Sequence, residues 1–511
     1  MARPSTQKRN TPRKSAVAKA ALRKSTASGP AQCQKPASSV ELAAALVNRP
    51  KVDFLDPFMR HAAMQAKGIS LCAFLVTLAA FQRGLKVTFH YERASFDPRF
   101  AKAKMQGHRG ELFSISNGTR THSFSRTLGD LTDPAANAIA EDKHLTKAAL
   151  KRAGVRTPEG IVVDKSQTAL VEKFLAQHPG KRFVVKPHDG SMGRGVHTNL
   201  GATEVVGVLA ESKESRSMIE EFIPGIEYRS FVVGDRCVAS LTKAPANVRG
   251  DGISSIRKLI DAKNTQRTGN PRLATNLIKE LYEISAHLRQ QGLSLDSILR
   301  IDQRVELLSS ASVSRGGDTM DTTTTAPDEV ARVSIAACQA IGLSVSGLDV
   351  IVTEEADRHV GYVIELNQRP HIGSQSFPMD GLGQGNAVAE AIIDYYFPET
   401  IRDRMHPTLA YDFAPIRAAL ESAQVAKLSL PVIGPDWRVL RFSENGVVAK
   451  AIAKLIETAA RTAGVFVISA PRQKGGIDLC LACAPANWRA FLNVIPTQFR
   501  AHLEKRAAEG T

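Results

Sequence analysis

Two acidic residues and an amide lie in a pair of apolar segments near residue 350. The runs GLDVIV (347–352) and GYVIELN (361–367) are expected to be antiparallel strands, because only a short polar loop joins them. Side chains alternate along a strand, so Glu365 and Asn367 share a face that Asp349 on the neighbouring strand can reach. Carboxylate and amide oxygens are ligands that Mg²⁺ prefers, and the ion can also bridge substrate phosphates. The pattern predicts a magnesium site, with a salt-bridged pair in the core as the structural alternative.

A second group of residues has the composition of a phosphate-binding loop. The short apolar run FVVKP (183–187) contains Lys186 and precedes DGSMGRGV, whose glycines would let backbone N–H groups approach phosphate oxygens. Lys186 would supply a positive charge to the same phosphates. An ordinary hairpin turn explains the same pattern equally well. The GK[ST] sequence of a P-loop does not occur in the chain.

Three further positions fit a nucleotide site. Residues 218–223 are expected to form a strand, whose backbone beside Glu220 and Phe222 could hydrogen-bond the edge of an adenine. Glu227, at the start of the next expected hairpin, could hold ribose hydroxyls. Arg315, in the sequence SRGGD, could neutralise charge on a transferring phosphoryl group. A solvated strand face for the acids, and an ordinary loop position for Arg315, are the structural alternatives.

Positioning these residues requires several α/β layers. Strand and helix patterns alternate through the chain, and the last part has the order strand, helix, strand, strand, helix, so the fold class is α/β with a small C-terminal α+β (ferredoxin-like) domain. The expected parts are a disordered basic tail (1–40), an α/β domain (41–140), a larger α/β domain (141–400), a linker (401–436) and the α+β domain (437–511).

Composition indicates a soluble globular protein of several domains. The 511 residues are 43% hydrophobic and 23% charged. The longest apolar run, Ile69 to Phe81, is too short to span a bilayer, and no signal-peptide core follows the basic N-terminus. Six cysteines are too few for a disulfide framework, and the lone CxxC, Cys480 and Cys483, is expected to pack inside a strand rather than bind zinc. We therefore expect a protein of the reducing cytoplasm, without membrane association.

The N-terminal tail carries much of the net charge of +17. Residues 1–40 contain nine Lys and Arg residues and no acid, and they lack an apolar period. Such a tail could bind nucleic acid or another polyanion through counterion release. A solvated, dispensable extension and a transit peptide are the alternatives.

The motifs occur in an order that resembles the ATP-grasp ligase family. The set comprises EDKHLTKAALKRAGVRTPEG, FVVKPHDGSMGRGV, IEEFIPGIEYRSFVVGDR, APANVRGDGISSIRKLID, SRGGDTMDTT, GLDVIV and VIELNQRP. It is similar to the ATP-grasp module of cyanophycin synthetase and of bifunctional glutathione synthetase, and more distantly to D-alanine–D-alanine ligase. The likeness covers roughly residues 141–398, and the region before it looks like a pre-ATP-grasp domain.

The resemblance implies roles for individual residues. Lys143 and Lys186 would contact ATP phosphates beneath a glycine-rich flap, Glu227 would bind ribose, and Asp349, Glu365 and Asn367 would hold Mg²⁺, with two ions expected and Mn²⁺ as the alternative. The flap residues are Gly190, Ser191, Gly193, Arg194 and Gly195, and the adenine-lining residues are Glu220, Glu221, Phe222 and Ile223. Lys186, Arg315 and Arg369 would be the catalytic cations.

The sequence also departs from these families. It has no second, P-loop domain of the cyanophycin synthetase type, and its first 140 residues are too few for a glutamate–cysteine ligase half. Gln368-Arg369-Pro370-His371 replaces a small residue after the metal-binding Asn, and Arg369 could clamp a substrate carboxylate. The C-terminal domain faintly resembles a catalytically degenerate acylphosphatase.

The expected activity is an ATP-dependent carboxylate–amine ligase. An acyl phosphate would form and an amine would displace the phosphate, with amino acids or short peptides as substrates and homo-oligomers as the assembly. An ATP-grasp phosphotransferase or kinase, and a non-catalytic nucleotide-binding protein with a polyanion-binding tail, are the alternatives.

Overall fold

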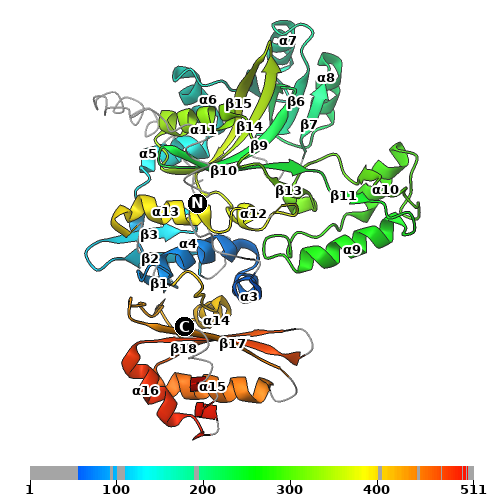
Figure 1. The fold of residues 1–511 in the computed structure, drawn as a ribbon. Helices are drawn as coiled ribbons and strands as arrows, with labels where there is room; N and C mark the ends of the chain where they lie inside the picture. Colours follow the sequence, from blue (N-terminus) through cyan, green and yellow to red (C-terminus); the bar gives the residue numbers. More distant parts are fainter. Residues whose placement is uncertain are drawn as a thin grey trace, which may run out of the picture.

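The computed structural model arranges the chain in stacked α/β layers (Figure 1). Within the described residues, the strands form five sheets. The described residues are 54, 56–91, 96–100, 110–188, 195–381, 383–400, 406–445, 449–472, 475–497, 499–501 and 503–504.

The N-terminal unit is a five-stranded sheet covered by an apolar helix. Helix α4 (Leu71–Phe81) is buried along its whole length, because it is apolar on every side. The sheet has the order β16-β1-β2-β3-β4, and its edge strand β16 comes from far along the chain. These strands are β1 (Lys86–His90), β2 (Leu112–Ser116), β3 (Thr121–Ser125), β4 (Leu128–Gly129) and β16 (Lys427–Ser429), with α3 (Pro57–Gln65) preceding α4.

Much of the expected linker 401–436 belongs to this unit. Strand β16 pairs with β1 in antiparallel register, and α14 (Phe413–Glu421) buries Phe413 and Ile416 in the same core. Tyr411 is buried as well, and its hydroxyl hydrogen-bonds Thr77 of α4 at 2.5 Å. The segment expected to be a linker contains apolar residues. Burying these side chains in the core stabilises the fold more than leaving them exposed in a solvated linker would.

The central region contains two sheets that face different helices. The four-stranded sheet has the order β5-β8-β6-β7, and the five-stranded sheet has the order β13-β10-β9-β14-β15. The first consists of β5 (Gly160–Asp164), β6 (Phe183–Pro187), β7 (His197–Leu200) and β8 (Arg216–Glu221), with α7 (Thr168–Ala176) and α8 (Ala202–Glu211) beside it. The second consists of β9 (Ile226–Val233), β10 (Arg236–Ala244), β13 (Asp318–Asp321), β14 (Val345–Glu355) and β15 (Arg358–Asn367).

One face of the five-stranded sheet is apolar and packs on helices. Helix α11 (Asp328–Ile341) begins after Pro327 and ends at Gly342, which takes a left-handed conformation that glycine readily adopts. Together with α5 (Pro134–Glu141) and α6 (Lys143–Arg152) it covers residues such as Val350 and Val363. Helix α13 (Ala387–Tyr396) packs against α4 and against β9 and β10, and so joins the two units.

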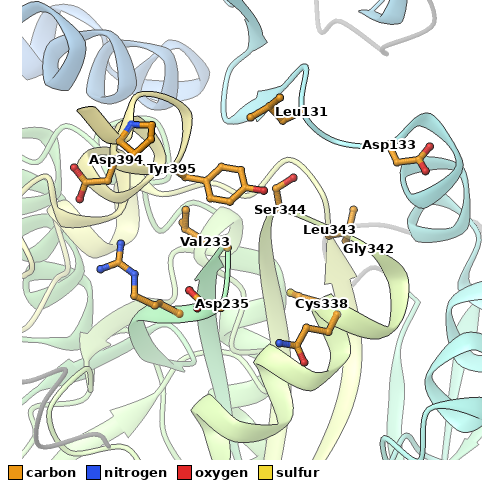
Figure 2. A pocket seen from close by; sticks show the side chains of 14 residues that line it. Leu131, Asp133, Val233, Asp235, Cys338, Gly342, Leu343, Ser344, Asp394 and Tyr395 are labelled. Atoms are coloured by element: carbon orange, nitrogen blue, oxygen red, sulfur yellow. The ribbon is translucent and has the colours of Figure 1, made fainter. Parts of the chain in front are cut away.

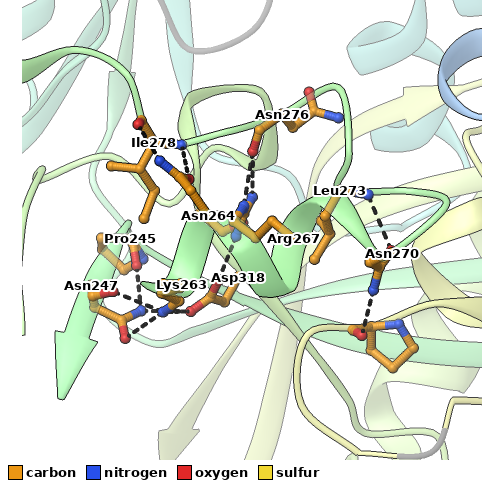
Figure 3. Close-up of polar contacts among 12 residues, drawn as sticks. Pro245, Asn247, Lys263, Asn264, Arg267, Asn270, Leu273, Asn276, Ile278 and Asp318 are labelled. Carbon is orange, nitrogen blue, oxygen red and sulfur yellow. Dashed lines mark hydrogen bonds and ion pairs between the residues drawn. The ribbon is translucent and has the colours of Figure 1, made fainter. Parts of the chain in front are cut away.

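An arm projects beyond β10 and β13 (Figure 1). It consists of α9 (Ile256–Thr268), α10 (Leu281–Gln290), β11 (Asn247–Arg249) and β12 (Arg304–Glu306). Asp318, at the start of β13, fastens it by accepting hydrogen bonds from Asn247 Nδ2 (2.9 Å), Lys263 Nζ (2.5 Å) and Arg267 Nη1 (2.8 Å) (Figure 3). The Arg267 side chain is fully buried and also donates to the Asn276 carbonyl. A buried ion-pair network therefore connects the arm to the sheet.

The C-terminal unit has the strand, helix, strand, strand, helix order expected from the sequence. Its elements are β17 (Arg438–Glu444), α15 (Ala449–Ala463), β18 (Phe466–Pro471), β19 (Ile477–Cys483) and α16 (Pro485–Val494). Cys480 packs towards the N-terminal core and Cys483 towards α15 and α16, so the two thiols lie on opposite faces of β19. Burial raises the pKa of Cys480 to about 12 and that of Cys483 to about 11. Among the described helices, none combines the length and apolarity that crossing a membrane requires.

Candidate functional site

A row of charged side chains crosses the face of the five-stranded sheet opposite α11. Asp349 on β14 is the register partner of Arg229 on β9, and Arg229 Nη1 donates to Asp349 Oδ2 at 2.8 Å. Lys243 on β10 donates to Asp349 Oδ1 at 2.9 Å and to Glu227 Oε1 at 2.8 Å. Strand alternation explains the arrangement, since Tyr228 between Glu227 and Arg229 points into the opposite, apolar layer.

The predicted metal ligands lie at one end of this row. Asp349 and Glu365 are register partners on β14 and β15, as the hairpin prediction requires, and Asn367 is two residues further along the same strand. The Glu365 carboxylate is exposed and forms no ion pair with the residues that the structure describes. Among those residues no three His, Cys, Asp or Glu side chains form a metal-binding group, so an ion here would be held by two carboxylates and one amide.

This donor set fits a magnesium ion that is shared with a substrate. Both Asp349 oxygens already accept from a cation, but each carboxylate oxygen has two lone pairs, and Glu365 offers two further oxygens. Mg²⁺ keeps several non-protein ligands in sites of this kind, so few protein oxygens are needed. The salt-bridged pair that the sequence left as an alternative is also present, because Arg229 and Lys243 bind Asp349.

The cations control the protonation of Asp349. Burial works against its charged form, but Arg229 and Lys243 outweigh burial and lower the pKa of Asp349 to about 2. A carboxyl whose folded pKa is depressed contributes stability above its unfolded pKa, near 3.8, and loses it as the pH falls towards 2.

Stability should therefore depend on Asp349 in a defined pH window. The free energy of unfolding of Asp349→Asn should lie below that of the wild type by a constant amount above about pH 4. The difference should shrink between about pH 4 and pH 2, which urea unfolding at a series of pH values without divalent ions would measure. A constant difference across that window would contradict the proposed charge state.

A second buried cluster joins α6 to the four-stranded sheet. Glu220 on β8 pairs with Lys147 Nζ at 2.5 Å and with Lys186 Nζ, so the predicted phosphate lysine is present beside a buried acid. Burial opposes the charge of Glu220, but Lys186 and Lys147 prevail and its pKa lies below the usual range. Burial lowers the pKa of Lys147 more than Glu220 raises it. Because two lysines face one acid, the cluster holds more positive than negative charge.

Lys143 and Lys186 flank the predicted glycine-rich flap. Lys143 Nζ donates to the His188 carbonyl at 3.3 Å, immediately before the flap begins. Gly195, at its end, has φ +67°, and a Cβ there would approach Pro187 Cγ at 3.0 Å, so glycine is favoured on both counts. Gly190, Ser191, Gly193 and Arg194 lie outside the described residues, and their phosphate contacts remain a prediction.

The predicted adenine segment is largely committed to the sheet. The N–H groups of Glu221 and Phe222 donate to the carbonyls of Glu159 (2.8 Å) and Arg182 (2.7 Å). The Glu221 carboxylate pairs with Lys181 at 2.7 Å, and Ile223 is buried. Adenine contacts by this segment would therefore use other backbone groups, and they stay a prediction.

Two predicted catalytic arginines have protein partners outside the charged row. Arg315 Nε donates to Glu280 Oε2 at 2.7 Å, and Arg315 also pairs with Glu283, as the loop-arginine alternative anticipated. Arg369 Nη1 donates to Ser125 Oγ at 3.2 Å, at the border with the N-terminal unit. Neither contact places these side chains on a phosphoryl group, so both roles remain predictions.

Sequence reasoning missed Lys147, Arg229 and Lys243. Lys147 follows Lys143 by four residues on a helix, and Arg229 follows Glu227 by two residues on a strand. Residues at these spacings share a face, so the sequence could have indicated both positions. Lys243 had no such signal, because its position depends on the register between β9 and β10.

An open cavity of about 730 Å³ lies elsewhere, at the far end of β9 and β10. Its walls include the β9–β10 turn, the end of α11 and the end of α13 (Figure 2). None of the predicted site residues lines it. We therefore do not assign the cavity to the same site.

The comparison with family models decides the class of the central region. Residues 140–373 match the model described as an ATP-grasp domain. This part of the chain is an ATP-grasp domain. The charged row, the Glu220 cluster and the sequence of the predicted flap all lie within it.

The ATP-grasp domain also has curated relatives. The chain is 31% identical over 344 residues to a glutathione biosynthesis bifunctional protein of Listeria innocua, covering 65% of this chain and 42% of that protein. It is 29% identical over 310 residues to cyanophycin synthetase of Synechocystis sp., covering 58% of this chain and 35% of that protein. The chain thus spans less than half the length of these relatives.

Solved structures give weaker matches to the ATP-grasp domain. A bifunctional glutathione synthetase from Pasteurella multocida aligns with 26% identity and a TM-score of 0.46, covering 57% of this chain and 40% of that one. A D-alanine–D-alanine ligase from Bacillus anthracis aligns with 17% identity and a TM-score of 0.32, covering 53% and 71%.

Proposed function

We propose that the protein is an ATP-dependent, ADP-forming ligase that joins the carboxylate of an amino acid or short peptide to an amine. The observation that carries the proposal is the position of Glu365 within the ATP-grasp domain. Its exposed carboxylate and Asn367 lie beside a row of paired charges on one sheet face. Curated relatives named for glutathione and cyanophycin synthesis support the same class of reaction.

In the proposed reaction a substrate carboxylate oxygen attacks the γ-phosphorus of ATP and ADP leaves. The amine nitrogen then attacks the acyl carbon, phosphate leaves and the nitrogen loses a proton. Lys186 and Lys143 would bind phosphate oxygens next to the flap, and Arg229 and Lys243 would fix Asp349 in its charged form. Catalysis would rest on positioning and on charge stabilisation, since the reaction needs no protein nucleophile.

Asp349, Glu365 and Asn367 would hold magnesium. When bound, the ion would neutralise charge on the transferring phosphoryl group. The chain's own contribution is a rigid frame, because Asp349 is fixed by two cations and β14 pairs with β15 from Gly347 to Glu355. Two ions, or Mn²⁺ in place of Mg²⁺, remain part of the proposal.

Product analysis tests this function. The full chain would be incubated with ATP, Mg²⁺ and pooled amino acids and dipeptides, with a sample lacking ATP as the control. A ligase would release ADP and free phosphate and yield a condensed product that mass spectrometry detects. A phosphorylated product without free phosphate would indicate a phosphotransferase instead, and nucleotide binding without turnover would indicate a non-catalytic protein.

Lys186→Met should raise the KM for ATP by about 10- to 100-fold, because a charge-assisted hydrogen bond contributes about 1.5–3 kcal/mol. Steady-state kinetics with varied ATP would measure the change. Lys151→Met is the matched control, since Lys151 lies on α6 but pairs with Glu159 at the surface. Equal KM values for the two variants would argue against a phosphate contact of Lys186.

Further features complete the proposal. The basic tail would bind a polyanion, and the chain would form homo-oligomers. Five cysteines among the described residues are free and buried, which suits a reducing cytoplasm.

A further inference from the structure

Four arginines and one histidine converge where the N-terminal unit meets the ATP-grasp domain. Arg126 lies in the turn between β3 and β4, Arg229 on β9, Arg272 after α9, and Arg369 and His371 after β15. We call them the arginine–histidine cluster. The four arginines all act on His371, and with burial they lower its pKa to about 3.

One direct contact joins two members of this cluster, and other contacts fix members to neighbouring polar groups. Arg126 Nη1 lies 3.3 Å from His371 Nε2, and because arginine can only donate, His371 accepts there and is neutral. Arg272 Nε donates to Ser374 Oγ at 3.1 Å, and His371 Nδ1 lies 3.6 Å from Cys72 Sγ. Specific hydrogen bonds therefore hold Arg126, Arg272 and His371 in place, unlike solvated arginines on a surface.

Among the described residues, the acids that pair with this cluster are Asp349 and Glu111. Arg229 is neutralised by Asp349, but Arg272 is half-buried and forms no ion pair with an acid among the described residues. The side chain of Arg126 is only 10% exposed, its acid Glu111 is 3.9 Å away, and its Nε has no hydrogen-bond partner in the described part of the chain. Buried, unpaired cations are unfavourable unless an anion joins them.

The backbone around the cluster is arranged to hold Arg126 in place. Arg126 has φ +57°, a left-handed conformation that is uncommon for a residue other than glycine. The next residue, Thr127, donates through Oγ1 to the Pro370 carbonyl at 3.0 Å and so fastens the turn to the segment of Arg369 and His371. A two-residue turn between paired strands requires a positive φ at its first position.

The cluster adjoins the charged row. A Cβ on Gly347 would approach Pro370 Cβ at 2.8 Å and Arg229 Nε at 3.2 Å, so both the Pro370 segment and the Arg229 side chain lie against Gly347. Arg229 pairs with Asp349 and also acts electrostatically on Arg272 and His371. A molecule bound at the cluster would lie next to the predicted metal ligands.

We infer that the arginine–histidine cluster binds a carboxylate of the acid substrate other than the carboxylate that is activated. The substrate would therefore carry at least two carboxylates, as an amino dicarboxylic acid or an acidic peptide does. Guanidinium groups match carboxylates in a bidentate geometry, so such a group would neutralise Arg272 and give the Arg126 Nε an acceptor. The inference rests on the proposed ligase function, because it concerns the acid of that reaction.

Binding of simple carboxylates to the full chain tests the inference. Glutarate and tricarballylate are the probes, butyrate is the monocarboxylate control, and calorimetry and melting temperature are the readouts. Glutarate or tricarballylate should bind at least 10-fold more tightly than butyrate and raise the melting temperature. Equal binding of butyrate would overturn the inference.

Variants distinguish a binding role from a structural one. Arg272→Met should weaken binding of the probes at least 10-fold while leaving the melting temperature of the free protein unchanged or higher, since an unpaired charge is removed. Arg272→Lys should bind with intermediate affinity, and Arg249→Met, at an exposed pair in the same arm, should behave as wild type. A lower melting temperature with unchanged probe binding would show a structural role and refute the inference.

The two proposals can fail separately. Ligation of monocarboxylates alone would refute this inference and leave the ligase intact. Tight, arginine-dependent binding of the probes without any ATP-dependent condensation would refute the ligase and leave the anion site.

Discussion

Glu365→Gln should lower ATP-dependent turnover by about 1,000-fold or more while leaving the fold intact. The carboxylate is exposed and unpaired among the described residues, so its loss should change the free energy of unfolding by less than about 0.5 kcal/mol. A magnesium ligand, in contrast, supports several kcal/mol of charge stabilisation in the transition state. Steady-state kinetics with varied Mg²⁺, together with the melting temperature, would measure both effects.

A matched control is available on the same hairpin. Glu354, near the end of β14, has an exposed carboxylate with only a 3.7 Å contact to His359. Glu354→Gln should retain wild-type turnover and wild-type Mg²⁺ dependence. If Glu365→Gln also retained turnover, the proposed metal site would be wrong, whatever the reaction.

Asp318→Asn should destabilise the protein by about 3 kcal/mol or more, because it leaves Arg267 and Lys263 buried without their anion. The network in Figure 3 shows why, since Asp318 is the acid that both cations share. For a domain of this size the melting temperature should fall by about 6–12 °C. Differential scanning calorimetry would record the shift.

The matched control for this network lies in the same arm. Asp302 pairs with Arg249 at 3.4 Å, and both side chains are exposed. Solvent screens such a pair, so Asp302→Asn should change the melting temperature little. Similar shifts for the two variants would contradict the assignment of Asp318 as the anchor of the arm.

Local sequence pattern determined several of the strands. The alternation around Asp349 and Glu365 predicted an antiparallel hairpin with both carboxylates on one face, and the register confirms it. The expected packing of Cys480 and Cys483 inside a strand is confirmed, since both lie buried on β19. These features depend on the spacing of residues within one element, and that spacing can be read directly from the sequence.

The tertiary structure alone decided which distant charges meet. Arg229 and Lys243 bind Asp349 from strands more than a hundred residues away in the chain, and Arg315 turns to Glu280 and Glu283. Strand β16 completes the N-terminal sheet from a segment that composition alone marked as a linker. Such pairings depend on sheet order and on the burial of apolar surface, which no local period encodes, so the charges that surround the candidate site emerge only from the folded chain.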